Sequence, residues 1–368
     1  MVNKNQMADL AIVGGGAAGM FAAATAAERG IRAVLIERKA RLGSKVLMTA
    51  NGRCNFTKDI SPDDFLKDLR LPGNPHGTAA FVERAIRECP PRKIIAGFKS
   101  LNLPLRRMAD ARMFPANGQA STIVHAFGDL LRDNNVPVVT NCPASAINTL
   151  ADGGFAVETR NFTIFAHNVL LATGGVSYPK TGSVGDGQKF ARELGHKIIP
   201  FRSGLIGLET SDRRIVSRAG ARFEDARAKI ISSDGRTLYE HRGEVDCEAF
   251  GISGAAVYNC QRFIAHSNLK DYEIEVWLGR ERLRFANLKA RPVKEAIVTL
   301  GGVDTREIDA ATMESKIVPH LYFAGEVMDI DGPTGGYNLT LAFATARKAV
   351  AAITEKKHGK TNHNHRKL

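Results

Sequence analysis

Residues 9–37 read DLAIVGGGAAGMFAAATAAERGIRAVLIE, and the order of residue types in this stretch decides the fold. The apolar residues 10–13 predict a strand, the alanine-rich segment up to Gly30 predicts a helix, and residues 33–36 predict a second strand that ends on Glu37. A strand, a helix and a strand in this order form a βαβ unit, in which a crossover helix joins two parallel strands. The stretch therefore predicts an α/β fold with a parallel sheet.

The turn between the first strand and the helix has the spacing G-x-G-x-x-G at Gly14, Gly16 and Gly19. Gly14 allows a tight turn, Gly16 lets the backbone approach a pyrophosphate, and Gly19 lets the helix pack closely on the sheet. The free N–H groups at the start of the helix, around Ala17 and Ala18, would face the phosphates. This turn therefore predicts a bound dinucleotide.

The acid that closes the unit, Glu37, stands roughly twenty residues beyond the glycines, where the fingerprint expects a residue that takes the ribose hydroxyls. A carboxylate there disfavours a 2′-phosphate, so FAD or NAD fits better than NADP. A glycine turn alone is a weak signal, because ordinary connections between a strand and a helix use one as well. The flanking strands, the helix and the acid together favour nucleotide binding over such a plain turn.

Length and composition are typical of a globular chain with more than one domain. The chain has 368 residues, 44% of them hydrophobic and 24% charged, which suffices for two domains and for the burial of a large cofactor. The N-terminus is polar and the first apolar run is the short strand at residues 10–13. Neither a signal peptide nor a membrane span is therefore predicted, and the expected location is the cytoplasm.

The five cysteines are scattered, with no C-x-x-C pair and no histidine nearby at ligand spacing. This pattern predicts reduced, buried thiols, and neither a disulfide framework nor a metal site. Cys54 differs from the others because it lies inside a glycine-bounded turn. A redox role is an alternative there to the structural one.

The net charge of +13 makes nucleic acid or another polyanion one candidate partner. Basic residues cluster at 38–41, 106–107, 213–227 and 280–291, but acids are interleaved among them, which is typical of solvated basic faces. We therefore expect a small-molecule substrate and regard nucleic acid as the less favoured partner. Residues 356–368 are polar and basic, and we predict that they form a disordered tail.

The pattern along the chain predicts one domain inserted into another. Residues 168–172 form an apolar strand that returns to the parallel sheet, so the nucleotide domain continues past residue 150. From about residue 201 the chain changes to short alternating runs, which are typical of a mostly β unit. We predict a discontinuous nucleotide-binding domain at 1–199 and 291–355, and a smaller, mostly β inserted substrate domain at 200–290.

A second glycine-rich run, near the C-terminus, predicts the other half of the same site. Gly325 and Glu326 end a predicted strand, and residues 329–339, DIDGPTGGYNL, place two carboxylates and three glycines before a helix. Carboxylates can accept ribityl hydroxyls, and glycines let backbone N–H groups approach the pyrimidine end of an isoalloxazine. The alternative is a glycine-rich loop with surface carboxylates.

Several runs together carry a resemblance to a known family: residues 11–19, 51–57, 172–183, 250–254 and 321–339. With them the chain resembles the BaiN/YhiN-like bacterial flavoproteins, also called aminoacetone oxidase-like enzymes, which share a nucleotide domain with the glutathione reductase group. The resemblance implies a Rossmann-type FAD-binding domain of that group, with FAD as the cofactor. It also implies that residues 52–55 lie along the flavin and that the backbone of Ala144 faces the adenine.

The turn, the C-terminal run and the resemblance together give one predicted cofactor-binding set. Its members are Gly14, Gly16, Ala17, Ala18, Gly19, Glu37, Arg38, Lys45, Asn51, Gly52, Arg53, Cys54, Asn55, Ala144, Thr173, Gly174, Gly325, Glu326, Asp331, Gly336, Asn338 and Leu339.

The chain departs from the family pattern in three places. Members usually have a Thr-His pair where this chain has Glu248 and Ala249, so a proton-transfer role of that histidine does not carry over. A proline usual after the next run is Ala255 here. The interval from Ile252 to Glu295 is short for the helical subdomain that the family inserts there, so the resemblance predicts a reduced substrate cover.

The sequence favours an FAD-dependent oxidoreductase that moves a hydride between the flavin and a small organic substrate. The resemblance implies either reduction of an activated C=C bond or oxidation of an amine or amino ketone. No second glycine fingerprint provides a nicotinamide site, so NADH or NADPH would visit the flavin transiently, as the substrate does. A flavin-dependent RNA-modifying enzyme and a noncatalytic FAD-binding protein remain alternatives.

No catalytic acid or base is assigned from the sequence. His125, His196 and His241 are expected to be structural, because nothing in the sequence places them near the flavin. Tyr178 and Tyr337 lie inside runs expected to be near the flavin, so they are the better candidates, although both could simply pack.

Overall fold

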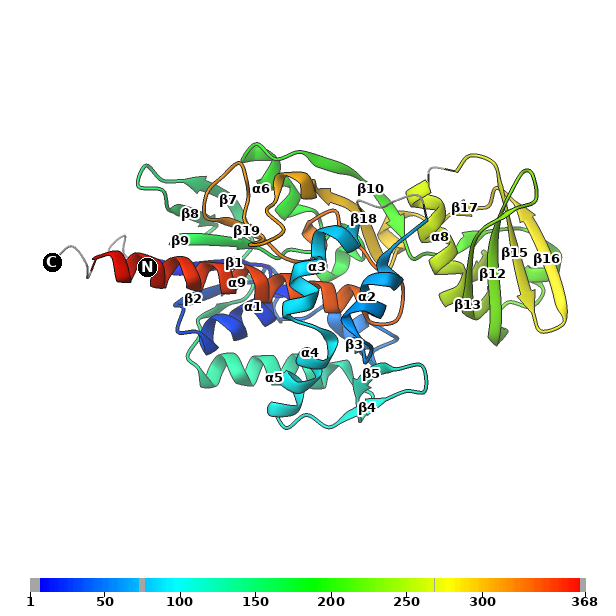
Figure 1. The fold of residues 1–368 in the computed structure, drawn as a ribbon, viewed down its shortest axis with the longest axis horizontal. Coiled ribbons are helices and arrows are strands. Elements are labelled where there is room, and N and C mark those ends of the chain that lie inside the picture. Colours follow the sequence, from blue (N-terminus) through cyan, green and yellow to red (C-terminus); the bar gives the residue numbers. More distant parts are fainter. Residues whose placement is uncertain (1–6, 73–76, 268, 365–368) are drawn as a thin grey trace.

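The βαβ unit consists of strand β1 (Ala8–Val13), helix α1 (Ala17–Glu28) and strand β2 (Ala33–Ile36). It lies in the larger of two units of a computed structural model that describes residues 7–72, 77–267 and 269–364 (Figure 1). Strands β1 and β2 pair in parallel, and β1 pairs in parallel on its other side with β9 (Thr163–Leu171). The predicted return of residues 168–172 to the parallel sheet is therefore confirmed.

The parallel sheet continues beyond these strands. Strand β6 (Val138–Val139) extends it next to β2, and β19 (Leu321–Phe323) pairs in parallel with the end of β9. An antiparallel hairpin of β7 (Ala144–Thr149) and β8 (Phe155–Thr159) joins the other half of β9. Because β1, β9 and β19 run in the same direction, their carboxyl ends meet at one edge of the sheet, where open α/β folds bind ligands.

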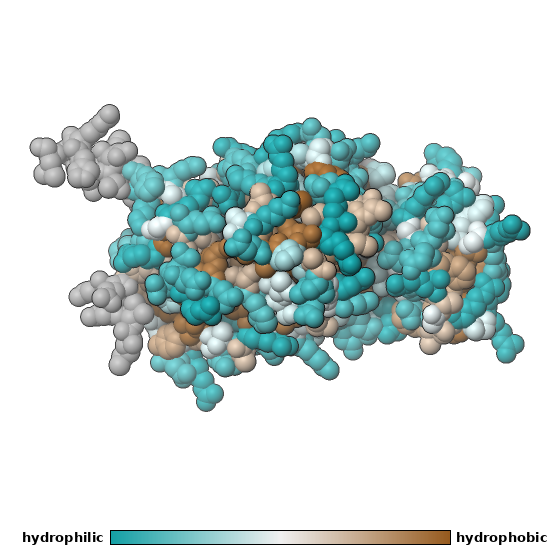
Figure 2. Space-filling view, turned by 90° about the horizontal axis from the view of Figure 1, so that it is seen from below, coloured by the Kyte–Doolittle hydropathy of each residue, from teal (hydrophilic) through white to brown (hydrophobic). Residues whose placement is uncertain are grey.

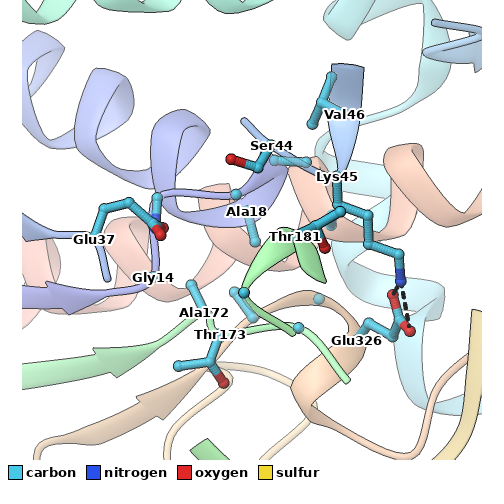
Figure 3. Close-up of a pocket in the computed structure, with 18 of the residues that line it drawn as sticks. Gly14, Ala18, Glu37, Ser44, Lys45, Val46, Ala172, Thr173, Thr181 and Glu326 are labelled. Carbon is cyan, nitrogen blue, oxygen red and sulfur yellow. Dashed lines mark hydrogen bonds and ion pairs between the residues drawn. The ribbon is translucent and has the colours of Figure 1, made fainter. Parts of the chain in front are cut away.

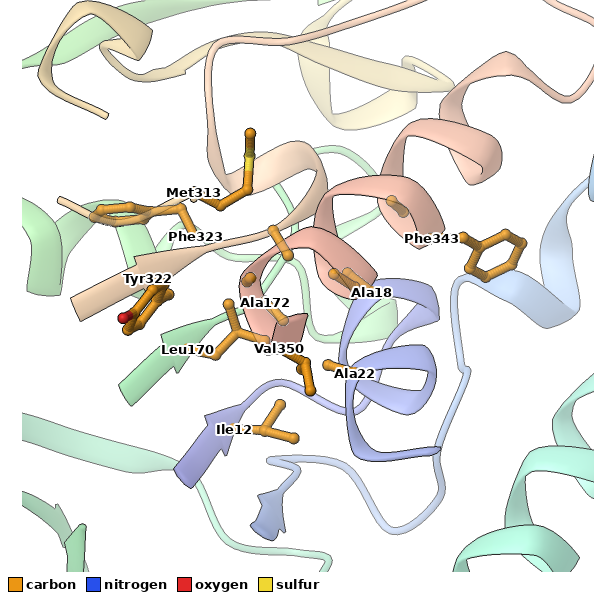
Figure 4. Close-up of a cluster of buried hydrophobic side chains, with 14 of the residues drawn as sticks. Ile12, Ala18, Ala22, Leu170, Ala172, Met313, Tyr322, Phe323, Phe343 and Val350 are labelled. Atoms are coloured by element: carbon orange, nitrogen blue, oxygen red, sulfur yellow. The ribbon is translucent and has the colours of Figure 1, made fainter. Parts of the chain in front are cut away.

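Two helices cover the sheet and meet each other along their lengths. Helix α1 is built mainly of alanine and is buried on most sides, because it packs both on the sheet and on the long helix α9 (Tyr337–Asn364). The ring of Phe21 in α1 stacks on that of Phe343 in α9, with centroids 4.9 Å apart. Figure 4 shows side chains from β1, β9, β19 and both helices in this buried cluster. Small residues on α1 allow the close approach that brings the C-terminal helix to the N-terminal turn.

The remaining elements of the nucleotide domain flank this centre. A small antiparallel sheet has the strand order β3-β5-β4. The flanking elements are β3 (Thr57–Lys58), α2 (Pro62–Leu69), α3 (Thr78–Glu88), α4 (Pro91–Ser100), β4 (Leu105–Arg107), β5 (Arg112–Pro115), α5 (Ala120–Asp133) and α6 (Asp186–Glu193).

The inserted unit is a second antiparallel sheet with its own core. The chain leaves the nucleotide domain through β10 (Ile198–Gly204) and returns through its antiparallel partner β18 (Val298–Val303). Between them lies a seven-stranded sheet of order β16-β15-β12-β13-β14-β11-β17, with helix α8 (Ala255–Ser267) packed on β12 and β13. The other elements are β11 (Leu208–Glu209), α7 (Arg213–Val216), β12 (Arg222–Ser232), β13 (Thr237–Glu248), β14 (Gly251–Ser253), β15 (Tyr272–Leu278), β16 (Glu281–Ala286) and β17 (Lys289–Ala290).

One expectation about the C-terminus is wrong. We predicted a disordered tail from residue 356, but helix α9 continues through Asn364, and residues 365–368 lie outside the described residues. The lysines at the start of this segment are good helix formers and continue the helix from residue 355. Two tertiary ion pairs hold it there: Lys356 contacts Glu314 at 2.5 Å, and Lys357 contacts Asp9 at 2.7 Å.

The surface is mostly polar. Hydrophilic side chains cover most of the face in Figure 2, with smaller hydrophobic areas between them. Across the described ranges, every helix is either too short or too polar to cross a lipid bilayer.

Candidate functional site

One pocket lies at the carboxyl edge of the parallel sheet, where the N-terminal turn and the start of α9 meet (Figure 3). Its walls come from residues 13–18, 36–38, 44–46, 172–174 and 324–326, with the first residues of α9 closing one side. About 1250 Å³ of space lies between these walls, part of it open to solvent. The pocket's position, at the edge where ligands bind in α/β folds, makes it the expected place for a cofactor.

The glycines of the first turn are required by geometry. Gly14 has φ +108°, and a Cβ there would lie 2.6 Å from the carbonyl oxygen of Ala172. A Cβ on Gly19 would lie 1.8 Å from the carbonyl oxygen of Gly14, so the helix could not approach the turn. A Cβ on Gly16 would have no atom within 4 Å and would project into open space. Gly14 and Gly19 therefore shape the turn, whereas Gly16 keeps the space in front of the helix empty.

The start of helix α1 is a ready anion site. Its N-cap is Gly16, which provides no side-chain cap, and its first turn carries no acidic residue. The first N–H groups of a helix have no partner inside the helix, and together with the helix dipole they attract anions. Because Gly16 leaves the adjoining space open, these donors can face the pyrophosphate of a dinucleotide.

The Glu37 carboxylate is fixed at the end of β2 by two backbone donors. One oxygen accepts the N–H of Gly15 at 2.7 Å, and the other accepts the N–H of Lys39 at 2.7 Å. Burial raises the pKa of this carboxyl, while the two N–H donors and the nearby cations act against that rise. Each oxygen keeps a second lone pair, so the group can still accept ribose hydroxyls.

A polar network joins four distant segments on the opposite wall of the pocket. The Lys45 ammonium donates to the Ser177 hydroxyl at 2.6 Å. It also donates to the Glu326 carboxylate at 2.8 Å (Figure 3). Glu326 also accepts from the Ser177 hydroxyl at 3.1 Å and from the backbone N–H of Thr299 at 2.8 Å. The Thr299 hydroxyl in turn accepts the N–H of Val176 at 2.8 Å. This network holds the loop around Lys45 against the end of β19.

Most of the predicted cofactor residues line this pocket. They are Gly14, Gly16, Ala17, Ala18, Glu37, Arg38, Lys45, Ala144, Thr173, Gly174, Gly325, Glu326, Asn338 and Leu339. Those that do not line it are Gly19, Asn51, Gly52, Arg53, Cys54, Asn55, Asp331 and Gly336. Gly19 acts through packing, as described above, so it needs no contact with a ligand.

Asp331, a member of the predicted set, has side-chain partners that the sequence did not predict. Its carboxylate is almost fully buried and forms ion pairs with Arg262 and, at 2.9 Å, with His266, both on helix α8 of the insert. Burial alone would raise the pKa of Asp331, but the charges of Arg262 and His266 outweigh it and hold the pKa far below its usual range. The structure thus joins Asp331 to the insert instead of presenting it to the pocket. The sequence could not show this, because the partners lie about seventy residues upstream.

The loop at residues 51–55 lies beside the C-terminal run but behind the pocket wall. The Asn55 amide can be oriented so that both its oxygen and its nitrogen have partners. The oxygen then accepts the N–H of Gly336 at 3.2 Å, and the nitrogen donates to the carbonyls of Met113 and Thr57. Gly336 has φ +95°, and a Cβ there would lie 2.7 Å from the backbone of Thr57. The two segments predicted to be near the flavin therefore contact each other, one turn away from the pocket residues Asn338 and Leu339.

Cys54 has a structural environment. The thiol is fully buried, and burial raises its pKa to about 12. Thiolates are the reactive form of cysteine, so a thiol held protonated inside the core is a poor redox group. The structural interpretation is favoured over the redox alternative.

Sequence reasoning missed several pocket residues. Asp186, at the start of α6, lines the pocket and accepts from the Arg38 guanidinium at 2.6 Å. Ile297 and Val298 line it as well, where β18 begins on the return from the insert. The glycines at 182 and 185 mark the loop before Asp186, but no local pattern distinguishes Ile297 and Val298 from ordinary core residues.

The three histidines lie in structural settings. The His196 ring is buried and bonds Ser315 at 2.8 Å and Glu307 at 3.1 Å, and burial lowers its pKa. His241 faces the interior of the insert, where burial and the nearby Lys58 lower its pKa. His125 is exposed on helix α5 and does not line the pocket. For His196 and His241 the expectation of a structural role agrees with these surroundings, whereas the exposed position of His125 does not test it.

The two candidate tyrosines differ in their surroundings. The Tyr337 hydroxyl donates to Asp68 and accepts from Lys58 at 3.2 Å, and its ring stacks on Phe65, all on the side away from the pocket. Tyr178 is half-buried with φ +50°, an uncommon backbone conformation for a bulky residue and one that clusters at functional sites. Among the described residues no group of three acidic, cysteine or histidine side chains is arranged to hold a metal ion.

A model of the family described as HI0933-like protein Rossmann domain matches residues 8–352, nearly the whole chain. The chain belongs to this family. The HI0933-like match spans the glycine turn, the insert and the C-terminal run, so it confirms the resemblance that those runs carried.

Two curated relatives align over most of this HI0933-like chain. The ribosomal RNA dihydrouridine synthase of Escherichia coli (strain K12) is 27% identical over 403 residues, covering 92% of this chain and 96% of the relative. The 3-dehydro-bile acid delta(4,6)-reductase of Clostridium scindens is 26% identical over 419 residues, covering 94% and 99%. Both alignments are longer than this chain of 368 residues, so each relative carries residues that this chain lacks.

Solved structures share the fold. The 3-ketosteroid delta1-dehydrogenase of Sterolibacterium denitrificans superposes with a TM-score of 0.60 at 12% identity, covering 95% of this chain and 100% of that one. The 3-ketosteroid-delta4-(5alpha)-dehydrogenase of Rhodococcus jostii RHA1 superposes with a TM-score of 0.57 at 13% identity, covering 96% and 98%. The predicted Rossmann-type FAD-binding fold is confirmed. One curated relative of this HI0933-like protein is named as a reductase.

Proposed function

We propose that the protein reduces a C=C bond conjugated to a carbonyl group. The supporting observation comes from two relatives that are about equally identical to this chain. Their names give different substrates but the same kind of reaction. Making dihydrouridine saturates the C=C bond next to a carbonyl of uracil, and a delta(4,6)-reductase saturates C=C bonds in conjugation with a 3-oxo group. The reaction class therefore has better support than any particular substrate.

The pocket residues fit FAD in an extended conformation. We propose that Glu37 accepts the adenosine ribose hydroxyls, that the start of α1 faces the pyrophosphate, and that Ala144 offers backbone to the adenine. The network of Lys45, Ser177 and Glu326 would then hold and orient the ribityl part of the cofactor. When bound, FAD supplies hydride transfer, and the protein's part is to position it and to exclude water.

A proton must also reach the substrate carbon that does not receive the hydride, and we propose Tyr258 as its donor. Tyr258 and Ile297 both pack on a small buried cluster that contains Val298, and Ile297 and Val298 line the pocket. Burial raises the pKa of Tyr258. Its hydrogen bonds with Ser253 and the backbone of Gly254 lower the pKa, but burial has the larger effect. A phenol that stays protonated near neutral pH can donate, and such donors contribute roughly 10²–10⁴-fold in rate.

Tyr258→Phe tests this role. We expect reduction of substrate by the prereduced holoenzyme to fall about a hundredfold or more, with FAD content unchanged. Tyr272→Phe is the matched control, because the Tyr272 hydroxyl only donates to the backbone of Leu288 inside the insert. A Tyr258→Phe enzyme with the wild-type rate and pH profile would remove Tyr258 from the mechanism.

The reaction itself is tested by anaerobic rapid mixing. The holoenzyme is mixed separately with NADH and NADPH while flavin absorbance is followed, and the reduced enzyme is then mixed with α,β-unsaturated ketones. We expect bleaching by one nucleotide and reoxidation by the enone in separate half-reactions. Bleaching by amines without enone turnover would instead identify an amine oxidase, and a flavin that no reductant bleaches would indicate a noncatalytic FAD-binding protein.

RNA is a second candidate substrate. It is favoured by the net charge of +13 and by one relative, which is a ribosomal RNA dihydrouridine synthase. Uracil contains the same conjugated C=C bond, so the pocket chemistry would be unchanged. Mass spectrometry of ribosomal RNA from cells with and without the gene would detect the loss of a dihydrouridine.

A further inference from the structure

The outer face of the insert's sheet carries an unusual row of side chains. Arg242, Arg227, Trp277 and Arg282 stand directly opposite one another on the four neighbouring strands β13, β12, β15 and β16. The residues between them along each strand face the core under helix α8, so this row points to the other side of the sheet. With strands about 4.8 Å apart, the row is roughly 14 Å long.

The next row on the same face differs in charge. It consists of Glu240, Lys229, Glu275 and Arg284 in the same strand order, so its charges alternate and cancel. The first row has three positive charges and no acid. Like charges directly opposite each other across a strand pair are destabilising, and Arg227 and Arg242 are such a pair. The neighbouring row compensates the charges of this pair only partly. Its one acid near them, Glu240, forms ion pairs with Arg227, Arg242 and Lys229 at 3.5, 4.0 and 3.2 Å.

Trp277 organises the arginines of its row. The guanidinium of Arg227 lies 4.1 Å from the centre of the indole ring, and that of Arg282 lies 5.5 Å from it. The Nε–H of Arg282 already donates to Glu275 at 2.6 Å, and its Nη2 lies 2.5 Å from the same carboxylate. Stacking on an aromatic ring fixes the plane of a guanidinium, and the N–H groups that face away from the acids can bind phosphate. Side-chain exposures of 76% for Arg242 and 47% for Arg282 make those groups accessible from solvent.

We propose that this row, Arg242, Arg227, Trp277 and Arg282, is a docking surface for single-stranded RNA. Three cations in a line match the negative charges of a nucleic-acid backbone, and an aromatic ring with flanking guanidiniums matches unstacked bases. The inference deepens the second candidate function, and it rests on that function for the choice of RNA over DNA. The strands that carry the row, β12, β13, β15 and β16, lie well apart from the parallel sheet with β1, β9 and β19, so the row would hold RNA without taking part in the chemistry (Figure 1).

The chain provides a direct probe of this surface, because Trp277 is its only tryptophan. Intrinsic tryptophan emission of the holoprotein therefore reports on the row itself. We expect a saturable change in that emission when a uridine oligomer of about 12 nucleotides is titrated at low salt. A DNA oligomer of the same length is the second arm and shows whether the surface distinguishes the 2′-hydroxyl.

A pair of charge-matched triple variants tests the assignment. Arg227→Gln, Arg242→Gln and Arg282→Gln together should lower RNA affinity about tenfold or more and reduce the salt dependence of binding by about two phosphate contacts. The control combines Arg84→Gln, Arg132→Gln and Arg306→Gln, three exposed arginines that also face nearby acids on the nucleotide domain. It removes the same total charge, so we expect a change of less than about threefold.

The outcomes separate this inference from the proposed reaction. Equal losses in the two triple variants, or RNA binding that leaves the Trp277 emission unchanged, would overturn the docking surface. Tyrosine fluorescence and thermal unfolding of each variant establish that the sheet is intact. Enone reduction by the row variant should equal that of the wild type, so a failure of the reaction and a failure of the docking surface are seen in different measurements.

Discussion

The glycine turn at residues 14–19 and the run at residues 325–339 meet in one pocket, yet they are built in different ways. The turn presents backbone groups, and its glycines follow from local geometry such as the clash that a Cβ on Gly19 would make with Gly14. The run depends on side chains whose partners come from distant segments, such as Lys45 for Glu326 and Arg262 for Asp331. The first kind of site can be derived from a local pattern, whereas the second requires knowledge of the tertiary contacts.

The strongest test of the backbone-built half is Gly16→Val. The new side chain has open space in the free protein, so the fold should persist, but it would occupy the place expected for the pyrophosphate. We expect a colourless protein whose FAD affinity falls by about a thousandfold or more, a cost of roughly 4 kcal/mol. The measurement is the flavin-to-protein ratio after dialysis against FAD.

Gly128→Val is the control for this change, because a Cβ on Gly128 in helix α5 also meets open space and lies far from the pocket. It should leave the protein yellow. A Gly16→Val protein that retains stoichiometric FAD would show that the pyrophosphate does not lie before α1.

The next test concerns the side-chain-built half and its link to the insert. Arg262→Met leaves the buried Asp331 without its main partner, which should lower the free energy of unfolding by about 3–5 kcal/mol. Adding Asp331→Asn should recover much of that loss, because the uncompensated charge is then removed. Urea unfolding followed by circular dichroism measures both variants.

Arg84→Met, in an exposed ion pair with Glu88, provides the comparison and should cost less than about 1 kcal/mol. If Asp331→Asn instead lowered FAD affinity more than tenfold with little change in stability, Asp331 would be a cofactor ligand. The two halves of the site would then be more alike than we infer.

A smaller effect is expected from Lys45→Met. The change leaves the Glu326 carboxylate at the pocket without its cation, so we expect FAD affinity to fall about tenfold, or roughly 1.4 kcal/mol. Titration of the apoprotein with FAD measures it. Lys45→Met combined with Glu326→Gln should bind better than Lys45→Met alone, and Lys189→Met on helix α6 should have no effect.

The smallest effect is expected near the start of strand β1 and near the end of helix α9, where Asp9 and Lys357 form an ion pair. Although burial by itself would raise it, the pKa of Asp9 is lowered to about 2 by hydrogen bonds from Arg32 and Lys357. A carboxyl with a depressed folded-state pKa stabilises the protein above its unfolded pKa of about 4, and this stability is lost as the pH falls toward 2. Asp9→Asn should therefore cost about 1 kcal/mol at pH 7, allowing for solvent screening.

The difference between wild type and Asp9→Asn should shrink as the pH is lowered from about 4 toward 2. Asp129→Asn, on the exposed surface of α5, should change the unfolding free energy by less than about 0.5 kcal/mol at any pH. A gap between wild type and Asp9→Asn that stays constant down to pH 2 would mean that the Asp9 charge contributes nothing.

The sequence predicted the parts of the structure that local rules determine. The order of apolar, glycine and alanine segments predicted the βαβ unit, and alternation predicted the β-rich insert. It also placed Glu37 and Lys45 among the residues that line the pocket. It could not predict that the Asp331 carboxylate pairs with α8, because no residue of the run 329–339 indicates which element packs against that run. It misjudged residues 356–364 because composition describes a free segment, while Lys356 and Lys357 are held by acids from elsewhere.

Strand β19 and helix α9, which complete the pocket, are the last elements of the described chain to be synthesised. A nascent polypeptide therefore carries the dinucleotide fingerprint for most of its translation without being able to enclose the flavin. The insert, with its own core, can fold earlier, since domains generally fold as units during synthesis. Ribosome-bound chains halted before residue 321 should consequently hold no FAD, so cofactor acquisition follows the folding of the insert.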